Sequence, residues 1–139
     1  MPDISFATQG TTFRLTQAAK HRQWLGQIAA LEQREIESLT YVFVTDRFLA
    51  KLNVEYLNHN TLTDILTFDY SGKGPVVGEI YISIPRVREN ARNFGQSFPT
   101  ELRRVMAHGL LHILGYKDKS RQQSARMRSK EEACLSLWA

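Results

Sequence analysis

The chain contains a single cysteine, Cys134, among its 139 residues. One thiol can form neither an internal disulfide bond nor the cysteine-rich cage of a structural zinc site. Long apolar runs are missing too, because the longest run is too short to cross a bilayer and is interrupted by two histidines. The N-terminal residues lack the basic and apolar regions of a signal peptide. We therefore expect a cytoplasmic protein that has no membrane partner.

Charge is distributed unevenly along a chain that has no internal repeat, low-complexity tract or linker. Residues 1–100 carry ten Lys/Arg and ten Asp/Glu, whereas residues 101–139 carry eight and four, so the whole excess of +4 lies in the last part. A basic field around a hydrolytic site favours an anionic substrate, most commonly nucleic acid. The alternative interpretation of these charges is a solvated helix face.

The apolar pattern predicts one domain, residues 1–139, in which helices interleave with about four strands. We expect an α+β fold with a mixed sheet flanked by helices, similar to a zinc hydrolase. The expected strands are a short one within 4–15 and those at 39–44, 65–70 and 76–83, the last two forming a hairpin. The expected helices are 16–32, 45–56, 85–94 and 120–137. A further helix is expected to start at 99 and to carry His108 and His112. On the first helix, Trp24, Leu25, Ile28 and Leu31 are predicted to face the core and His21 the solvent.

Residues 108–118 form the most informative motif, His-Gly-Leu-Leu-His-Ile-Leu-Gly-Tyr-Lys-Asp. On a helix, His108 and His112 lie on one face about 6 Å apart, which lets both imidazoles reach one metal ion. Gly115 can end the helix in a left-handed conformation, so that Asp118 can turn back as a third ligand. Three protein ligands with an open fourth position describe a catalytic zinc site. The alternative is that each histidine hydrogen-bonds to a neighbour, but a metal would satisfy both buried imidazoles at once.

Hydrolysis is the reaction class that such a zinc ion supports, because it activates bound water and polarises the attacked group. Zinc proteases of the His-Glu-x-x-His type place a glutamate after the first histidine, whereas this chain has Gly109, which argues against a protease. Gly109 would allow either a close approach of substrate to the metal or tight helix packing. A phosphodiester substrate would be held by basic side chains, which could otherwise be ordinary surface charge. The candidates for RNA contacts are Arg103, Arg104, Lys117 and Lys119.

The segment from His108 to Tyr116 resembles the His-Gly-x-Leu-His-Leu-x-Gly-Tyr signature of the YbeY family of rRNA maturation factors, which are metal-dependent endoribonucleases. Three further segments, 52–56, 63–68 and 78–80, resemble the family's Leu-Asn-x-x-Tyr, Thr-Asp-Val-Leu-Ser-Phe and Gly-Asp-Ile elements in the same order. Glu101 matches the family's glutamate before the histidine helix. The resemblance implies a central mixed sheet with zinc, cleavage of single-stranded RNA, maturation of the 16S rRNA 3′ end, and ribosome quality control in the bacterial cytoplasm.

Two departures from the family pattern affect the site. The family's usual Gly-Tyr-Asp-His ending supplies a third histidine ligand, whereas here Asp118 occupies that position, which we interpret as a ligand exchange. A carboxylate lowers the charge of the site by one, which makes harder ions such as Mn²⁺ more plausible than at a three-histidine site. After Tyr56, many members carry an arginine linked to RNA cleavage. This chain has Leu57 there, and His59 is only a loose substitute.

The leading hypothesis from the sequence is an endoribonuclease with one Zn²⁺ per chain, held by His108, His112 and Asp118. Its expected partners are single-stranded RNA, 16S rRNA and the small ribosomal subunit, and a monomer is the default oligomeric state. The sequence identifies no general base, but Tyr116, Asp64 and Glu79 lie near the motifs. Two other hypotheses are a metallopeptidase-like zinc hydrolase and a ribosome-associated RNA-binding protein with a structural metal.

Overall fold

The computed structural model describes residues 3–57 and 64–138 of the chain. The strands in these ranges are β1 (Asp3–Thr8), β2 (Ile36–Val44), β3 (Ile65–Asp69) and β4 (Val76–Ser83). The helices are α1 (Ala18–Leu31), α2 (Asp46–Leu57), α3 (Ile84–Asn93), α4 (Phe98–Ile113) and α5 (Arg121–Ser136). These elements confirm the predicted order of strands and helices.

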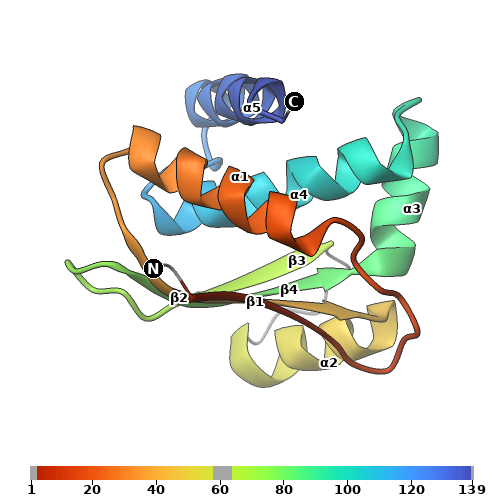
Figure 1. Cartoon of the computed structure of the whole chain (residues 1–139). Coiled ribbons are helices and arrows are strands. Elements are labelled where there is room, and N and C mark those ends of the chain that lie inside the picture. The colour runs from red at the N-terminus through yellow and green to blue at the C-terminus, as the bar shows by residue number, and fades with distance from the viewer. Residues whose placement is uncertain (1–2, 58–63, 139) are drawn as a thin grey trace.

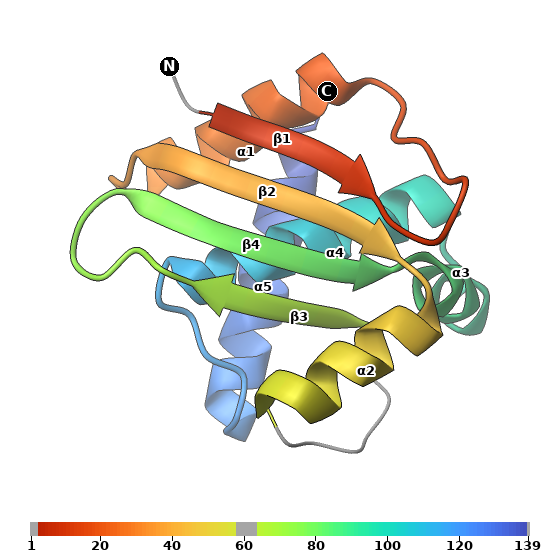
Figure 2. The same ribbon diagram turned by 90° about the horizontal axis from the view of Figure 1, so that it is seen from below.

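The four strands form one mixed sheet in the order β1-β2-β4-β3 (Figure 2). β2 pairs in parallel with both β1 and β4, whereas β3 and β4 form the predicted antiparallel hairpin. The β-branched and aromatic residues of 39–44 lie in β2, an interior strand of the sheet. The sheet therefore confirms the α+β class expected from the sequence.

The helices cover the two faces of the sheet unequally (Figure 1). α1 and α4 lie on one face, and α5 packs on the outer side of α4, whereas α2 lies on the opposite face. The larger apolar cluster fills the space between the sheet, α1 and α4, with Trp24, Phe43 and Leu110 among its buried members. A smaller cluster around Leu49 and Leu66 lies under α2. α4 is thus enclosed by the sheet on one side and by α5 on the other.

Serine side chains cap the helices at three of their N-termini. Ser83 accepts a hydrogen bond from the Arg86 amide at the start of α3, and Ser97 accepts one from the Thr100 amide at the start of α4. Ser120 forms a reciprocal capping box with Gln123 at the start of α5. No helix in the described residues is long and apolar enough to cross a membrane.

Two predictions about α1 are wrong. Leu31 is 67% exposed, because the buried stripe of α1 ends at Ile28 and Ala29, before the last turn. His21 is only 3% exposed, since it precedes Trp24 and Leu25 at helical spacing on the same stripe. Its Nδ1 lies 2.9 Å from the Gln17 carbonyl oxygen, and its ring lies 4.6 Å from that of Trp138. Burial lowers the pKa of His21.

Two glycines allow α4 to pack closely on the sheet. A Cβ on Gly109 would lie 2.9 Å from Ile65 Cδ1 and 3.0 Å from Ile80 Cγ2. A Cβ on Gly78 would lie 2.8 Å from the Phe68 carbonyl oxygen and 2.9 Å from Ile113 Cδ1. Of the two roles considered for Gly109, its position supports tight packing of the helix on the sheet.

Gly78→Ala tests the lack of space at this glycine, because the added methyl group would meet both the Phe68 carbonyl oxygen of β3 and Ile113 Cδ1 of α4. We expect the free energy of unfolding to fall by about 1–3 kcal/mol, the usual cost of overpacking. Gly26→Ala in α1 is the matched control, since a Cβ there has no heavy atom within 4 Å. The control is expected to stabilise the protein by up to about 1 kcal/mol through helix propensity. Urea denaturation of both variants measures the difference, and an unchanged midpoint for Gly78→Ala would contradict the packing argument.

Candidate metal centre

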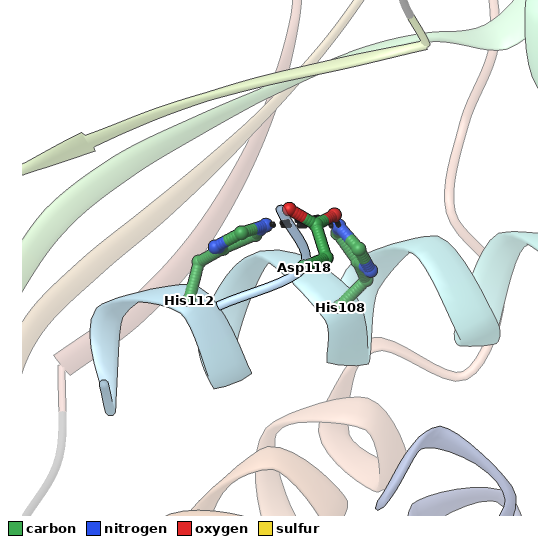
Figure 3. A group of neighbouring side chains, drawn as sticks. All are labelled: His108, His112 and Asp118. Atoms are coloured by element: carbon green, nitrogen blue, oxygen red, sulfur yellow. Dashed lines mark hydrogen bonds and ion pairs between the residues drawn. The ribbon is translucent and has the colours of Figure 1, made fainter. Parts of the chain in front are cut away.

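His108 and His112 lie one turn apart on α4, and their Nε2 atoms point toward each other and toward Asp118 (Figure 3). The two Nε2 atoms are 3.1 Å apart. Asp118 Oδ2 lies 3.4 Å from Nε2 of His108 and 3.5 Å from Nε2 of His112. In the described part of the chain, these three residues form a donor group that could hold a metal ion.

The spacing of the three donor atoms fits a tetrahedral zinc ion. Ligands about 2.0–2.2 Å from such an ion lie about 3.3–3.5 Å from one another, close to the three distances found here. All three side chains remain partly open to solvent, which leaves room for a further ligand.

The loop between α4 and α5 brings Asp118 back toward the histidines. Gly115 has a φ of +112°, and the amides of Gly115 and Tyr116 donate to the carbonyl oxygens of His112 and Leu111. This confirms the prediction that Gly115 turns the chain at the end of the histidine helix. The backbone oxygen of Asp118 then accepts a hydrogen bond from Ser124 Oγ of α5, 2.8 Å away. The first turn of α5 therefore helps to hold the loop that carries the third donor.

A carboxylate on α5 contacts His108 at the ring nitrogen that faces away from the other two donors. Glu131 Oε2 lies 2.6 Å from His108 Nδ1. Since a carboxylate only accepts, Nδ1 carries a proton, and in the neutral ring Nε2 then has the lone pair that a metal needs. Arg104 lies 3.3 Å from the other oxygen of Glu131. This pattern of carboxylate, imidazole and donor position is typical of a metal ligand with its supporting residue.

The two imidazoles have different electrostatic surroundings. Burial would lower the pKa of His108, but its hydrogen bond to Glu131 and the charge of that carboxylate outweigh burial and raise the pKa. Burial lowers the pKa of His112, and the nearby charge of His108 lowers it further. The neutral form that binds a metal is thus favoured at His112.

A pocket of about 480 Å³ opens beside the three donors and reaches β3. Asp64 and Asp69 line it together with Asp118, and no lysine or arginine belongs to the described lining. Burial raises the pKa of Asp64, which also accepts a 3.4 Å hydrogen bond from the Asn90 side chain. The described lining of the pocket is therefore acidic, and a metal ion in the donor group would offset part of that negative charge.

Of the three candidates for a general base, only Asp64 lines this pocket. The Tyr116 hydroxyl donates to Glu32 Oε1 at 2.7 Å. Glu79 lies on β4 between Gly78 and Ile80, both of which approach α4, so its side chain points to the opposite face of the sheet. His59 lies outside the described residues.

The four basic candidates have different surroundings. The Arg103 guanidinium stacks over the Trp138 ring, 4.5 Å from its centroid. Arg104 pairs with Glu131 and with Glu132, whose Oε1 is 2.6 Å away. Lys117 and Lys119 are exposed and flank Asp118. Neither lysine belongs to the described lining of the pocket beside the histidines, and Lys117 lines a separate pocket with Glu32 and Arg126.

Sequence reasoning missed Glu131. Its signal is its spacing, because it lies four residues after Met127 and three before Cys134, both of which are buried on α5. An acidic residue within an apolar helix stripe requires a buried partner. That partner is His108, and it could not be identified without knowing how α5 crosses α4.

Comparisons with known proteins agree with this architecture. The protein-family model described as Endoribonuclease YbeY matches residues 4–139. A relative from Cytophaga hutchinsonii named Endoribonuclease YbeY is 46% identical over 135 residues, which are 96% of this chain and 94% of the relative. A relative of the same name from Flavobacterium johnsoniae is 44% identical over 128 residues, 92% of each chain. The solution structure of TM1509 from Thermotoga maritima has a TM-score of 0.65 at 26% identity, covering 96% of this chain and 87% of that one.

Replacing Asp118 tests its place in the donor group. Asp118→Asn removes the negative charge and should weaken metal binding, whereas Asp118→His restores a good ligand and should largely preserve it. Elemental analysis of the purified variants after reconstitution measures the effect. Full metal occupancy in Asp118→Asn would remove Asp118 from the ligand set.

Proposed function

The chain belongs to the YbeY endoribonuclease family, and on that premise we propose that it cleaves single-stranded RNA at a metal held by His108, His112 and Asp118. The observation that carries the proposal is the convergence of two imidazole nitrogens and one carboxylate oxygen at an open pocket. This donor set provides three ligands and leaves a position for substrate or water.

Zn²⁺, one ion per chain, is the metal that we propose for this site. Two neutral imidazoles and one carboxylate suit zinc, and their donor spacing agrees with tetrahedral coordination. Bound zinc would supply a positive charge for the phosphate oxygens and lower the pKa of coordinated water.

The acidic lining of the pocket makes RNA binding there depend on the metal. Asp64, Asp69 and Asp118 would repel a phosphodiester, and the described lining offers no lysine or arginine. Lys117 and Lys119 lie beside Asp118 in the sequence and are exposed, so they suit contacts with the RNA backbone on either side of the cut bond. An uncleaved RNA should therefore bind more weakly once the metal is removed.

Asp64 is the proton acceptor that we propose for the reaction. Its carboxylate lines the pocket beside both histidines, and its raised pKa, caused by burial, makes it a better base than an exposed aspartate. The carboxylate would take the proton released when the attacking oxygen bonds to phosphorus, as the bond to the leaving oxygen breaks. The attacking oxygen is that of a water molecule or that of the RNA 2′-hydroxyl.

The biological role that we propose is maturation of the 16S rRNA 3′ end and ribosome quality control in the cytoplasm. It rests on the family resemblance and on the match to proteins named Endoribonuclease YbeY. The partners would be the small ribosomal subunit and its single-stranded RNA, with the protein acting as a monomer.

RNA cleavage with and without metal tests the proposed activity. We expect the zinc-reconstituted protein to cut a single-stranded RNA but not a matched duplex, and we expect chelation or His112→Ala to abolish cutting. The assay is gel analysis of end-labelled RNA, with binding of an uncleavable analogue measured in parallel. RNA affinity unchanged by chelation, with no cleavage under any metal, would support an RNA-binding protein with a structural metal. Cleavage of casein but not of RNA would support a metallopeptidase.

Asp64→Asn tests the proton acceptor. We expect the cleavage rate at saturating RNA to fall about 10²–10⁴-fold, the usual contribution of a general base, while zinc content and thermal midpoint stay near the wild-type values. Glu79→Gln is the matched control, since that carboxylate lies on the opposite face of the sheet. A cleavage rate unchanged in Asp64→Asn would exclude the proposed role.

A further inference from the structure

Helix α5 contributes a buried acidic side chain, Glu131, which contacts His108 of the candidate metal centre. The Glu131 side chain is 9% exposed, and its two oxygens have different partners on α4. Oε2 lies 2.6 Å from His108 Nδ1, and Oε1 lies 3.3 Å from an Arg104 guanidinium nitrogen. Glu131 thus connects α5 to two residues that lie one turn apart on α4.

We propose that Glu131 is a positioning residue that holds His108 ready for metal binding and thereby couples the docking of α5 to the metal. This inference rests on the proposed metal site but not on RNA cleavage. Glu131 would not touch metal or substrate, and it would act only through the His108 ring.

The hydrogen bond fixes both the tautomer and the direction of the His108 ring. In the neutral ring the carboxylate holds the single proton on Nδ1, which leaves the lone pair on Nε2, the atom that faces His112 and Asp118. The negative charge of Glu131 also makes the imidazole a stronger ligand. A histidine without this partner could rotate or place its proton on Nε2.

Arg104 in turn holds Glu131 in place. Its guanidinium lies between Glu131 and Glu132 of α5 and is 3.6 Å from the buried Glu101 carboxylate of its own helix. A buried carboxylate is costly unless it is paired and hydrogen-bonded. Glu131 has a positive partner on one oxygen and an N–H donor on the other, so both of its oxygens are paired at the helix interface.

The arrangement makes metal binding and α5 docking support each other. A metal on Nε2 of His108 would orient the ring, and the oriented ring would hold Glu131. If the docking of α5 strengthens metal binding through Glu131, then bound metal must strengthen the docking of α5 by the same free energy, because the two events are thermodynamically linked. Metal binding should therefore slow amide hydrogen exchange in α5 around Glu131, although α5 supplies no ligand.

Zinc affinity in two neighbouring variants tests the proposal. Glu131→Gln keeps the size of the side chain but removes its charge, and we expect zinc affinity to fall about 10–100-fold, as for other supporting residues of metal ligands. Glu132→Gln is the matched control, because Glu132 also pairs with Arg104 but has no described contact with His108. The control should stay within about twofold of wild type. Competition with a chromophoric chelator measures the affinities, and thermal unfolding of the zinc-free proteins checks that both variants fold.

Amide exchange of the same proteins gives an independent readout. Zinc should protect α5 in the wild type and in Glu132→Gln, but far less in Glu131→Gln at equal zinc occupancy. Equal zinc affinity of Glu131→Gln and wild type, or equal protection of α5, would overturn the positioning role. Zinc binding that depends on Glu131 in a protein that cuts no RNA would overturn the nuclease proposal alone. If the protein cleaves RNA but its zinc affinity is the same in Glu131→Gln and wild type, this inference alone would be overturned.

Discussion

The close contact of α4 with strands β3 and β4 is the constraint on which the candidate site depends. Gly109 lies between the two histidines, and at this point the helix approaches Ile65 and Ile80 as closely as a residue without a side chain allows. The contact fixes the height and rotation of α4 over the sheet. His108 and His112, on either side of Gly109, are therefore presented to the pocket beside β3 rather than to the core.

The other parts of the site come from the C-terminal side of α4. Gly115 turns the chain, the start of α5 holds the Asp118 loop through Ser124, and Glu131 supports His108. The candidate ligands thus depend on two packing events, that of α4 on the sheet and that of α5 on α4. A chain that folded its sheet without docking α5 would have two histidines but neither a fixed third donor nor a supported ring.

Local patterns in the sequence predicted the parts of this account that depend on neighbours in the chain. The spacing of His108, His112, Gly115 and Asp118 is a property of one helix and its C-terminal turn, and the hairpin of β3 and β4 has its own turn residues. Contacts between elements distant in sequence could not be predicted in the same way. Glu131 meets His108 and Arg104 only because α5 crosses α4, and the His21 ring meets Trp138 only because α1 packs near residue 138.

The central claim is that His108, His112 and Asp118 hold one metal ion, and X-ray absorption spectroscopy of the zinc-loaded protein tests it most directly. We expect nitrogen and oxygen donors at about 2.0–2.2 Å from the zinc ion. Multiple-scattering features from two imidazoles should be present in the wild type, and one imidazole should be lost in His112→Ala. A sulfur ligand, which Cys134 could supply, or an imidazole count unchanged in His112→Ala, would contradict it.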